Sequence, residues 1–434
     1  MEKTRSARKL PSALGNRMPA EWEPHESTWL AWPHLRGDWP GKFEPIPWVY
    51  AEIVRNLARH ERVDLIVKNE RAENGARAVL ERADALSDNV CFHRWRTDRV
   101  WTRDSGCIFL AQNTEPQGLK PPTNDDASGT AEEAAERIAV RRPAPKGASD
   151  FEELTVSLKR YPDTNLSFSA ACEAVPFPKP TGEGRSKAKH DKPLMGLHFQ
   201  FNAWAKYDNY KLDARLGSRM AKAAGARIVH PTSGDERVVL EGGSIDVNGR
   251  GTLLTSEECL LSTTQQRNPS MDRVAYERMF ADYFGVQSVI WLGEGIEGDD
   301  THGHVDDLSR FVAANTVVTM VEANAQDENY SALQHNLGRL RAARDQDGQR
   351  LNVVEIPMPR RVVFEGRRLP ASYANFYIAN RAVLAPVFND PNDRIALNTL
   401  AELFPAREIV PIYCGDLIWG FGALHCMTQQ QPAC

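Results

Sequence analysis

Apolar residues recur at helical spacing between Trp48 and Arg62, which predicts an amphipathic helix over this stretch. A short apolar run predicts a strand over Arg62–Lys68. Further patterns predict a helix over Asn69–Ala85 and strands over Val90–Trp95 and Gly106–Leu110. Because helices and strands alternate along this part of the chain, the pattern indicates an α/β protein.

The regular pattern stops after Leu110 and returns at Gly196. Residues 111–195 are rich in Pro, Ser, Thr, Ala, Lys and Glu and have little apolar periodicity. They predict a flexible, low-complexity insertion, in which a short helix is predicted over Phe151–Leu158. The chain is therefore expected to form a single domain, residues 1–434, whose core comprises residues 17–110 plus 196–432.

After the insertion, strand–helix–strand units recur to the C-terminus. Val238–Ser256 predicts two strands that turn at Asn248-Gly249, a favoured hairpin turn. Helices are predicted over Ser270–Phe284 with Ser270 as N-cap, over Tyr330–Arg344, and over Asp390–Phe404 with Asp390 as N-cap and Pro391 in the first turn. Strands are predicted over Ser288–Leu292, Asn352–Ile356, Glu408–Tyr413 and Ala423–Gln429, two strands over Tyr373–Phe388, and a β-rich stretch over Arg310–Glu322. Such units fit either a parallel sheet or a propeller of small modules.

The composition narrows the class of partner. The chain has 434 residues, of which 41% are hydrophobic and 26% charged, with a formal net charge of −5. These values are typical of globular proteins. The chain has no long basic run of the kind that binds nucleic acid, and it has no apolar stretch long enough for a membrane span. A mildly acidic protein suits a small cationic substrate.

The seven cysteines are odd in number and irregularly spaced, which indicates free thiols in a reducing compartment. Residues 1–17 lack the apolar segment of a secretory signal. A cytoplasmic location is therefore expected. The oligomeric state is left open, with a homo-oligomer as one option.

The C-terminal tail contains the first candidate for chemistry, Cys426, in a glycine-preceded stretch expected to be extended. Far upstream, residues 299–307 contain His302 and His304 among four aspartates. A cysteine with a distant histidine and carboxylates is the pattern of a thiol nucleophile served by an acid/base. The competing interpretation of Cys426 is a buried core cysteine.

The histidine segment allows three interpretations. If it is extended, His304 and Asp306 point to the same face, because strand side chains alternate. They would then offer an acid/base and a carboxylate to one ligand. The same residues, together with His302, also suit a divalent metal, and a polar loop is the third interpretation.

Two further carboxylates stand beside glycines. Asp104 lies between Trp101 and Gly106, where it is either a buried carboxylate or a turn aspartate paired with Arg103. Glu241 precedes two glycines, which indicates either a close approach to the backbone or an ordinary turn.

Together these residues form a reagent set for attack on a guanidinium carbon. Carboxylates hold the planar cation by paired hydrogen bonds, and a thiolate attacks its central carbon. A histidine protonates the departing ammonia and then activates the water that hydrolyses the thiouronium intermediate. Neither a metal nor an organic cofactor is expected.

With these candidate residues and the motifs around them, the chain resembles the agmatine deiminase and bacterial-type peptidyl-arginine deiminase family. The resemblance extends in order across nearly the whole chain outside the insertion. The matching stretches are Arg17–His25, Trp29–Pro33, Trp101–Gly106, Phe201–Trp204, Glu241–Ser244, Arg267–Pro269, Gly303–Asp306, Leu369–Tyr377 and His425–Pro432.

The resemblance implies the pentein fold, a five-bladed, pseudo-symmetric α/β propeller with the active site on its axis. It places Cys426 on the family's nucleophile and His304 on its acid/base. It also implies that Asp104 and Asp306 grip the guanidinium and that Glu241 is a further active-site carboxylate near the histidine.

In the same way the resemblance assigns Trp101 to the aromatic residue along the substrate's alkyl chain. These assignments weaken the metal interpretation. Three departures from the family pattern lie beside the expected pocket and leave the substrate's identity open. Gly420–His425 replaces a Gly-Gly-Gly-Asn-Ile-His run, Cys107 replaces a proline, and His302 replaces Asp or Asn.

The leading hypothesis is a deiminase that converts agmatine to N-carbamoylputrescine and ammonia in putrescine and polyamine biosynthesis. The alternative is the same chemistry on free or peptidyl arginine, which yields citrulline. A non-catalytic binding module and a metal-dependent hydrolase are the remaining hypotheses. An Arg or Lys in the pocket would discriminate between the first two, because it could meet an α-carboxylate.

Overall fold

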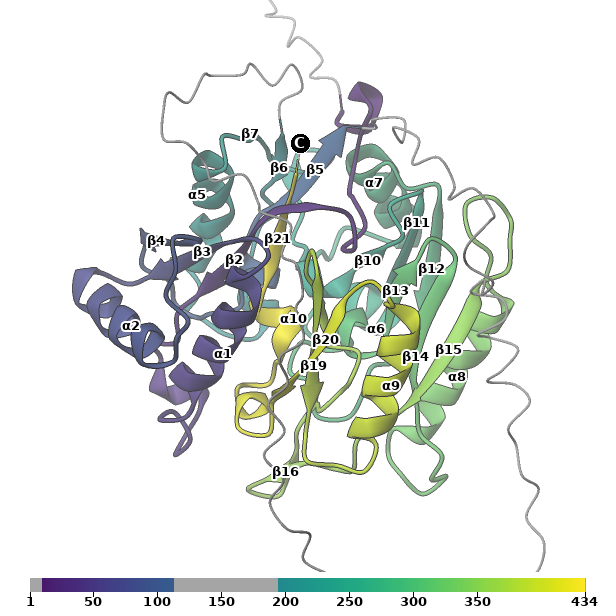
Figure 1. The fold of residues 1–434 in the computed structure, drawn as a ribbon. Coiled ribbons are helices and arrows are strands. Elements are labelled where there is room, and N and C mark those ends of the chain that lie inside the picture. Colours follow the sequence, from purple (N-terminus) through teal and green to yellow (C-terminus); the bar gives the residue numbers. More distant parts are fainter. Residues whose placement is uncertain (1–9, 113–193, 434) are drawn as a thin grey trace, which may run out of the picture. The chain divides into compact units, whose positions relative to one another are not determined.

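The computed structural model describes residues 10–112 and 194–433 (Figure 1). Most of the predicted insertion, including the helix expected over Phe151–Leu158, lies outside the described residues and stays a prediction. Its two ends, residues 111–112 and 194–195, continue or adjoin strands of the core.

Five sheets in the described residues share one connection pattern. In each sheet one strand pairs antiparallel with a second, and the second pairs parallel with a third that follows a helix (Figure 1). The first two sheets contain β1 (Asn16–Arg17), β5 (Ile108–Gln112), β6 (Met195–Leu197) and β7 (Arg227–Val229), and β10 (Asp246–Val247), β11 (Thr252–Ser256) and β12 (Ser288–Leu292). The next two contain β13 (Ser309–Ala313), β14 (Thr316–Val321) and β15 (Asn352–Pro357), and β18 (Tyr377–Ile378), β19 (Ala382–Val387) and β20 (Glu408–Tyr413). The last contains β21 (Gln429–Pro432), β2 (His25–Ala31), β3 (Arg62–Val67) and β4 (Val90–Arg94).

Helices connect the parallel strands of these sheets. The longer ones are α1 (Ile46–Ala58), α2 (Glu70–Arg82), α5 (Leu216–Ala223), α6 (Glu257–Leu261), α7 (Arg273–Phe284), α8 (Tyr330–Ala342) and α9 (Asp393–Leu403). Single-turn elements are α3 (Thr102–Ser105), α10 (Leu424–Met427), η1 (Ser12–Leu14), η2 (Arg36–Asp38), η3 (Ala203–Ala205), η4 (Asp213–Arg215), η5 (Gly242–Ser244), η6 (Val305–Asp307) and η7 (Leu417–Gly420). Two small ribbons pair β8 (Thr232–Ser233) with β9 (Glu236–Arg237) and β16 (Val363–Phe364) with β17 (Arg367–Arg368).

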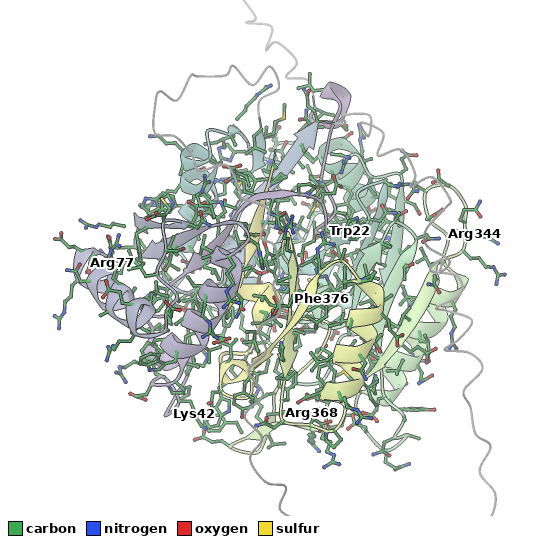
Figure 2. The ribbon with its side chains drawn as sticks, in the orientation of Figure 1. Trp22, Lys42, Arg77, Arg344, Arg368 and Phe376 are labelled. Atoms are coloured by element: carbon green, nitrogen blue, oxygen red, sulfur yellow. The ribbon has the colours of Figure 1, made fainter. Side chains whose placement is uncertain are left out.

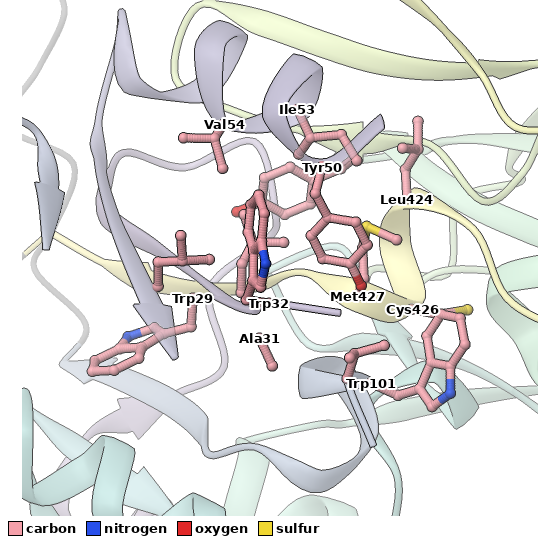
Figure 3. Close-up of a cluster of buried hydrophobic side chains, with 14 of the residues drawn as sticks. Trp29, Ala31, Trp32, Tyr50, Ile53, Val54, Trp101, Leu424, Cys426 and Met427 are labelled. Carbon is pink, nitrogen blue, oxygen red and sulfur yellow. The ribbon is translucent and has the colours of Figure 1, made fainter. Parts of the chain in front are cut away.

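Helix α1 shows how the apolar pattern builds the core. Its buried positions Tyr50, Ile53, Val54 and Leu57 recur at three- and four-residue spacing and therefore share one face. Figure 3 shows three of them, Tyr50, Ile53 and Val54. They lie with Trp29 of β2, with Trp32, which directly follows β2, and with Met427 of α10. The core thus packs directly behind the turn that bears Cys426.

Charged side chains mostly lie outside this packing. Arg77 and Arg344 point outwards in Figure 2, whereas Phe376 is fully buried among the sheets. No helix in the described part of the chain is long and apolar enough to cross a membrane.

The predicted helix ends need correction at two N-termini. Helix α7 begins at Arg273, and its cap is Asp272, whose side chain accepts the N–H of Ala275 at 2.9 Å, rather than Ser270. Helix α9 begins at Asp393 after Asn392, because the predicted cap Asp390 instead accepts the N–H of Asn392 in a turn before the helix.

The predicted hairpin of Val238–Ser256 is also different. Its first strand is shorter than predicted and comprises only β10, Asp246–Val247, because residues 242–244 form the turn η5. The loop has four residues, 248–251, instead of two. The Asn248 side chain folds this loop by accepting the N–H groups of Arg250 and Thr252 at 2.9 and 3.0 Å.

The expected strand over Ala423–Gln429 is wrong, because Cys426 lies on the one-turn helix α10 and the strand β21 begins only at Gln429. The Thr428 hydroxyl closes the turn by donating to the carbonyl of Leu424 at 2.8 Å. The segment of His304 and Asp306 is likewise not extended, since Asp306 lies in the turn η6.

The fold positions comparable turns ahead of comparable strands. Turn α3 precedes β5, η5 precedes β10, η6 precedes β13 and α10 precedes β21. Each of these strands is one of the two strands in the antiparallel pair of its sheet. Turn α3 contacts α10 and η5, and η5 contacts η6, so four distant segments meet at one place.

Candidate active site

A pocket of about 320 Å³ opens beside these turns. This volume suits a small ligand. Its lining combines aromatic rings with carboxylates and one guanidinium: Trp101, Trp204, Tyr207, Phe364, Trp419, Phe421, Asp38, Asp104, Asp300, Arg99 and Cys426. Three predicted site residues, Trp101, Asp104 and Cys426, therefore line the same pocket.

Cys426 lies at the pocket with its side chain almost fully buried. Its Sγ lies 3.1 Å from the Asn375 side-chain nitrogen, which donates to it, and 3.7 Å from Asp306 Oδ2. Burial raises the pKa of the Cys426 thiol well above its ordinary value, and Asp306, Asp307 and Asp104 add to the effect. The raised pKa favours the thiol form of Cys426 in the free protein.

Asp104 is fixed by two donors from other segments. Its Oδ1 accepts the N–H of Gly243 at 3.0 Å, and its Oδ2 accepts the indole N–H of Trp204 at 2.9 Å. Burial raises the pKa of Asp104 to about 6, although His304 partly offsets the effect. The alternative pairing with Arg103 is not found, since that guanidinium donates to Gln430 Oε1 at 2.6 Å.

Gly243 makes this close approach possible. A Cβ atom at this position would lie 2.6 Å from His304 Nδ1 and 3.0 Å from Asp104 Oδ1. The glycines after Glu241 thus serve a close approach of side chains to the backbone, as one of the two sequence interpretations proposed.

Asp306 is oriented by a residue that sequence reasoning did not single out, His425. The His425 Nδ1 and Asp306 Oδ2 atoms are 2.7 Å apart, and His425 Nε2 lies 2.8 Å from Glu21 Oε2. Asp306 Oδ1 is buried without a hydrogen-bond partner among the described residues. Burial alone would raise the pKa of Asp306, but His425 and His304 outweigh it and lower the pKa.

His304 lies fully buried between carboxylates. Its Nδ1 is 3.9 Å from both Asp104 Oδ1 and Asp306 Oδ1, and its Nε2 is 3.7 Å from Glu241 Oε2. These separations exceed hydrogen-bond length. Burial acts to lower the pKa of His304, but Asp104, Cys259 and Glu241 outweigh it and raise the pKa well above its ordinary value.

Glu241 is fully buried and held from the side by Arg267, whose Nε lies 3.2 Å from Glu241 Oε1. Burial raises the pKa of Glu241, but Arg267 and His304 outweigh it and bring the pKa down to about 2. The glutamate is therefore ionised at neutral pH and faces a cationic imidazole.

His302 does not join this group. Its ring lies 3.1 Å from Ser262 Oγ and 3.4 Å from Glu258 Oε1. Among the described residues, His302 belongs to no cluster of potential metal ligands. The hypothesis from the sequence that His302, His304 and Asp306 jointly hold a metal is thus wrong, because His302 does not lie in one ligand cluster with the other two.

The outer pocket carries ion pairs of its own. Arg99 Nη1 donates to Asp38 Oδ1 at 2.7 Å, and its guanidinium lies 4.3 Å from the centre of the Tyr207 ring. Asp300 accepts Lys206 Nζ at 2.5 Å and Arg367 Nη2 at 3.0 Å. The pocket therefore offers an arginine, Arg99, although a carboxylate already binds it.

Comparisons with known proteins agree with this arrangement. A family model described as Porphyromonas-type peptidyl-arginine deiminase matches residues 17–128 and 182–432. The agmatine deiminase of Pseudomonas aeruginosa is 30% identical over 446 residues, which cover 98% of this chain and 97% of the relative.

Solved structures show the same fold. The agmatine deiminase of Enterococcus faecalis matches with a TM-score of 0.73 and 24% identity, over 99% of each chain. The agmatine deiminase of C. jejuni matches with a TM-score of 0.67 and 25% identity, over 96% of each chain. The fold and the pocket therefore define an amidine-hydrolysing enzyme of α/β architecture.

More narrowly, the chain belongs to the Porphyromonas-type peptidyl-arginine deiminase family, which confirms the predicted family. Enzymes of this kind deiminate a guanidino group, and so does this chain.

Proposed function

We propose that this enzyme deiminates its substrate through a covalent intermediate on Cys426. The observation that carries the proposal is that four candidate residues meet at or behind one pocket. Cys426 and Asp104 line the pocket, and the buried Asp306 and His304 lie close to them. Asp104 and Asp306 bind the guanidinium, and the Oδ1 atom of each lies 3.9 Å from His304 Nδ1. Cys426 Sγ, 3.7 Å from Asp306 Oδ2, then lies close to the guanidinium carbon.

The reaction balances with these groups and water alone. Binding of the guanidinium favours ionisation of the Cys426 thiol, whose proton passes to water, and the thiolate attacks the guanidinium carbon. The tetrahedral adduct expels ammonia, which takes a proton from His304. Water then adds to the thiouronium carbon while His304 accepts a proton. Collapse of the second adduct breaks the C–S bond and regenerates the thiolate, and the hydroxyl proton of the ureido product passes to ammonia, which becomes ammonium.

The leading substrate is agmatine, and the product would be N-carbamoylputrescine. Relatives named agmatine deiminase that cover nearly the whole chain support this choice. In this proposal Trp101 lies along the alkyl chain and a carboxylate of the outer pocket meets the ammonium. A role in putrescine biosynthesis, a cytoplasmic location and a five-bladed arrangement of the sheets around the site belong to the same proposal.

Free or peptidyl arginine is the second candidate because Arg99 lines the pocket. Its guanidinium could exchange Asp38 for the carboxylate of an arginine substrate. Arginine would then be accepted by the outer pocket, whereas agmatine leaves the Arg99–Asp38 pair intact.

A ureido-product assay tests these proposals. Purified enzyme would be offered agmatine, arginine, guanidinobutyrate and arginyl peptides, with Cys426→Ser as the inactive control. We expect the largest kcat/KM with agmatine. A higher value with arginine or a peptide would show that agmatine is not the preferred substrate. Absence of product from every compound would overturn the deiminase assignment for this chain.

A further inference from the structure

A second buried thiol lies behind His304. Cys259 belongs to α6 and is 1% exposed. Its Sγ, a ring nitrogen of His304 and a carboxylate oxygen of Glu241 all lie within 4.8 Å of one another. The proposed reaction gives this thiol no role.

Two atoms of this trio lack the partners that buried polar atoms normally have. His304 Nε2 and Glu241 Oε2 face each other at 3.7 Å, and neither has a hydrogen-bond partner in residues 10–112 and 194–433. Both side chains are fully buried. Because buried polar atoms are rarely left unpaired, the space between them indicates room for a further bonding partner.

The spacing suits a tetrahedral metal ion. Zinc takes imidazole nitrogen and carboxylate oxygen at about 2.0–2.2 Å, which separates two such ligand atoms by about 3.4 Å. The observed separation of 3.7 Å between the His304 and Glu241 atoms is close to this value. A thiolate at about 2.3 Å from the ion completes a Cys–His–carboxylate set that zinc favours.

The surrounding side chains leave the ligand atoms available. Arg267 binds Glu241 Oε1 at 3.2 Å and leaves Oε2 free. The other ring nitrogen of His304, Nδ1, lies 3.9 Å from oxygens of Asp104 and Asp306, which is longer than a hydrogen bond. A small shift of the ring would let one of these carboxylates accept the Nδ1 proton, which is the contact that orients metal-binding histidines.

We propose that Glu241, Cys259 and His304 form a binding site for a thiophilic divalent cation such as Zn²⁺, and that the bound ion inhibits the enzyme. Binding forms metal–oxygen, metal–sulfur and metal–nitrogen bonds and releases the thiol proton of Cys259 and a proton of His304 to water. The inhibition, unlike the binding, rests on the proposed function. With Nε2 on the metal, His304 stays a neutral imidazole that keeps only its Nδ1 proton. It can then no longer alternate between imidazolium and imidazole, as the two proposed proton transfers require.

Titration of the full chain with Co²⁺ tests the site without any assay of activity. Thiolate coordination of Co²⁺ gives charge-transfer absorption, which we expect for wild type, and Cys259→Ser should bind at least about tenfold more weakly. Cys91→Ser is the matched control, because Cys91 forms the other cluster of potential ligands in the described residues, with Asp64 and His93. Equal binding by wild type and Cys259→Ser, or loss of binding only in Cys91→Ser, would overturn the site.

A second measurement removes dependence on how the variants fold. Anomalous diffraction from zinc-soaked crystals of the wild-type chain should locate the ion between the three side chains, and an ion bound only elsewhere would overturn the site. If the ion lies between them while deimination continues at full rate, the inhibition and the acid/base role of His304 fail together. If no ion binds, the site fails alone and the proposed deimination is untouched.

Discussion

Replacing Asp104 by Asn tests the guanidinium grip most directly, because the amide keeps the shape of the side chain but not its charge. A charge-assisted hydrogen bond to a desolvated cation contributes about 1.5–3 kcal/mol. At about 1.4 kcal/mol per factor of ten, Asp104→Asn should lower kcat/KM by about 10- to 150-fold at pH 8.

The pH dependence makes this prediction sharper. Burial raises the pKa of Asp104 to about 6, so the wild-type carboxylate is ionised above that pH and neutral below it. Only the ionised form grips the cation. Wild-type kcat/KM should therefore fall as the pH drops through about 6, whereas the neutral amide of Asp104→Asn has no such step. The deficit of the variant should shrink by about tenfold for each pH unit below 6, so a tenfold deficit nearly vanishes at about pH 5 and a larger one is strongly reduced there.

The measurement is kcat/KM for both enzymes from about pH 5 to about pH 9, which reports ionisation in the free enzyme. Asp64→Asn is a suitable control, since Asp64 on β3 is also buried but pairs with Arg62 of the same strand and with His93 of β4, and does not line the pocket. It should keep the acid step. A deficit in Asp104→Asn that is the same at every pH would refute the reasoning.

Three further outcomes are expected. Cys426→Ser should fold like wild type, as measured by denaturant unfolding, yet give almost no ureido product, because a hydroxyl is a far weaker nucleophile than a thiolate. Gly422→Ala should raise KM for agmatine, since its new Cβ would lie 2.7 Å from the Trp101 ring, and an unchanged KM would remove Trp101 from the substrate site. Arg310→Met should lower the free energy of unfolding by about 3–5 kcal/mol, because it removes the cation beside buried Asp246 and one of the cations beside Glu21, whereas Arg341→Met, from an exposed ion pair, should cost at most about 1 kcal/mol.

Most elements of the fold could be predicted because their apolar patterns are local. Strands β12 and β20 have the bounds predicted from the sequence, Ser288–Leu292 and Glu408–Tyr413. The prediction was wrong where a polar side chain decides the backbone. Asp272 caps α7, and Asn248 shapes the loop after β10, and neither contact changes the apolar pattern.

Part of the candidate site could likewise be predicted from the sequence and part could not. Motifs identified the residues that meet at or behind the pocket, but not those that orient them. Asn375 accepts the N–H of His425 at 3.0 Å and donates to Cys426, although it lies 51 positions before the cysteine. His425 pairs with Asp306, 119 positions before it, and with Glu21, 404 positions before it. These contacts exist only in the folded chain, and the one available signal was that each residue falls within a family-like stretch.

The charges of the site explain how Cys426, the proposed nucleophile, can be kept unreactive until substrate arrives. In the free enzyme, burial and the neighbouring carboxylates hold the pKa of Cys426 well above its ordinary value. The same carboxylates are the groups proposed to bind the guanidinium. A bound cation offsets the negative charge of Asp104 and Asp306 and adds its own positive charge beside the sulfur, which favours the thiolate. The acidic surroundings that disfavour ionisation of Cys426 without substrate thus draw in the cation that permits it, so a neutral analogue of the same shape would be a poor substrate.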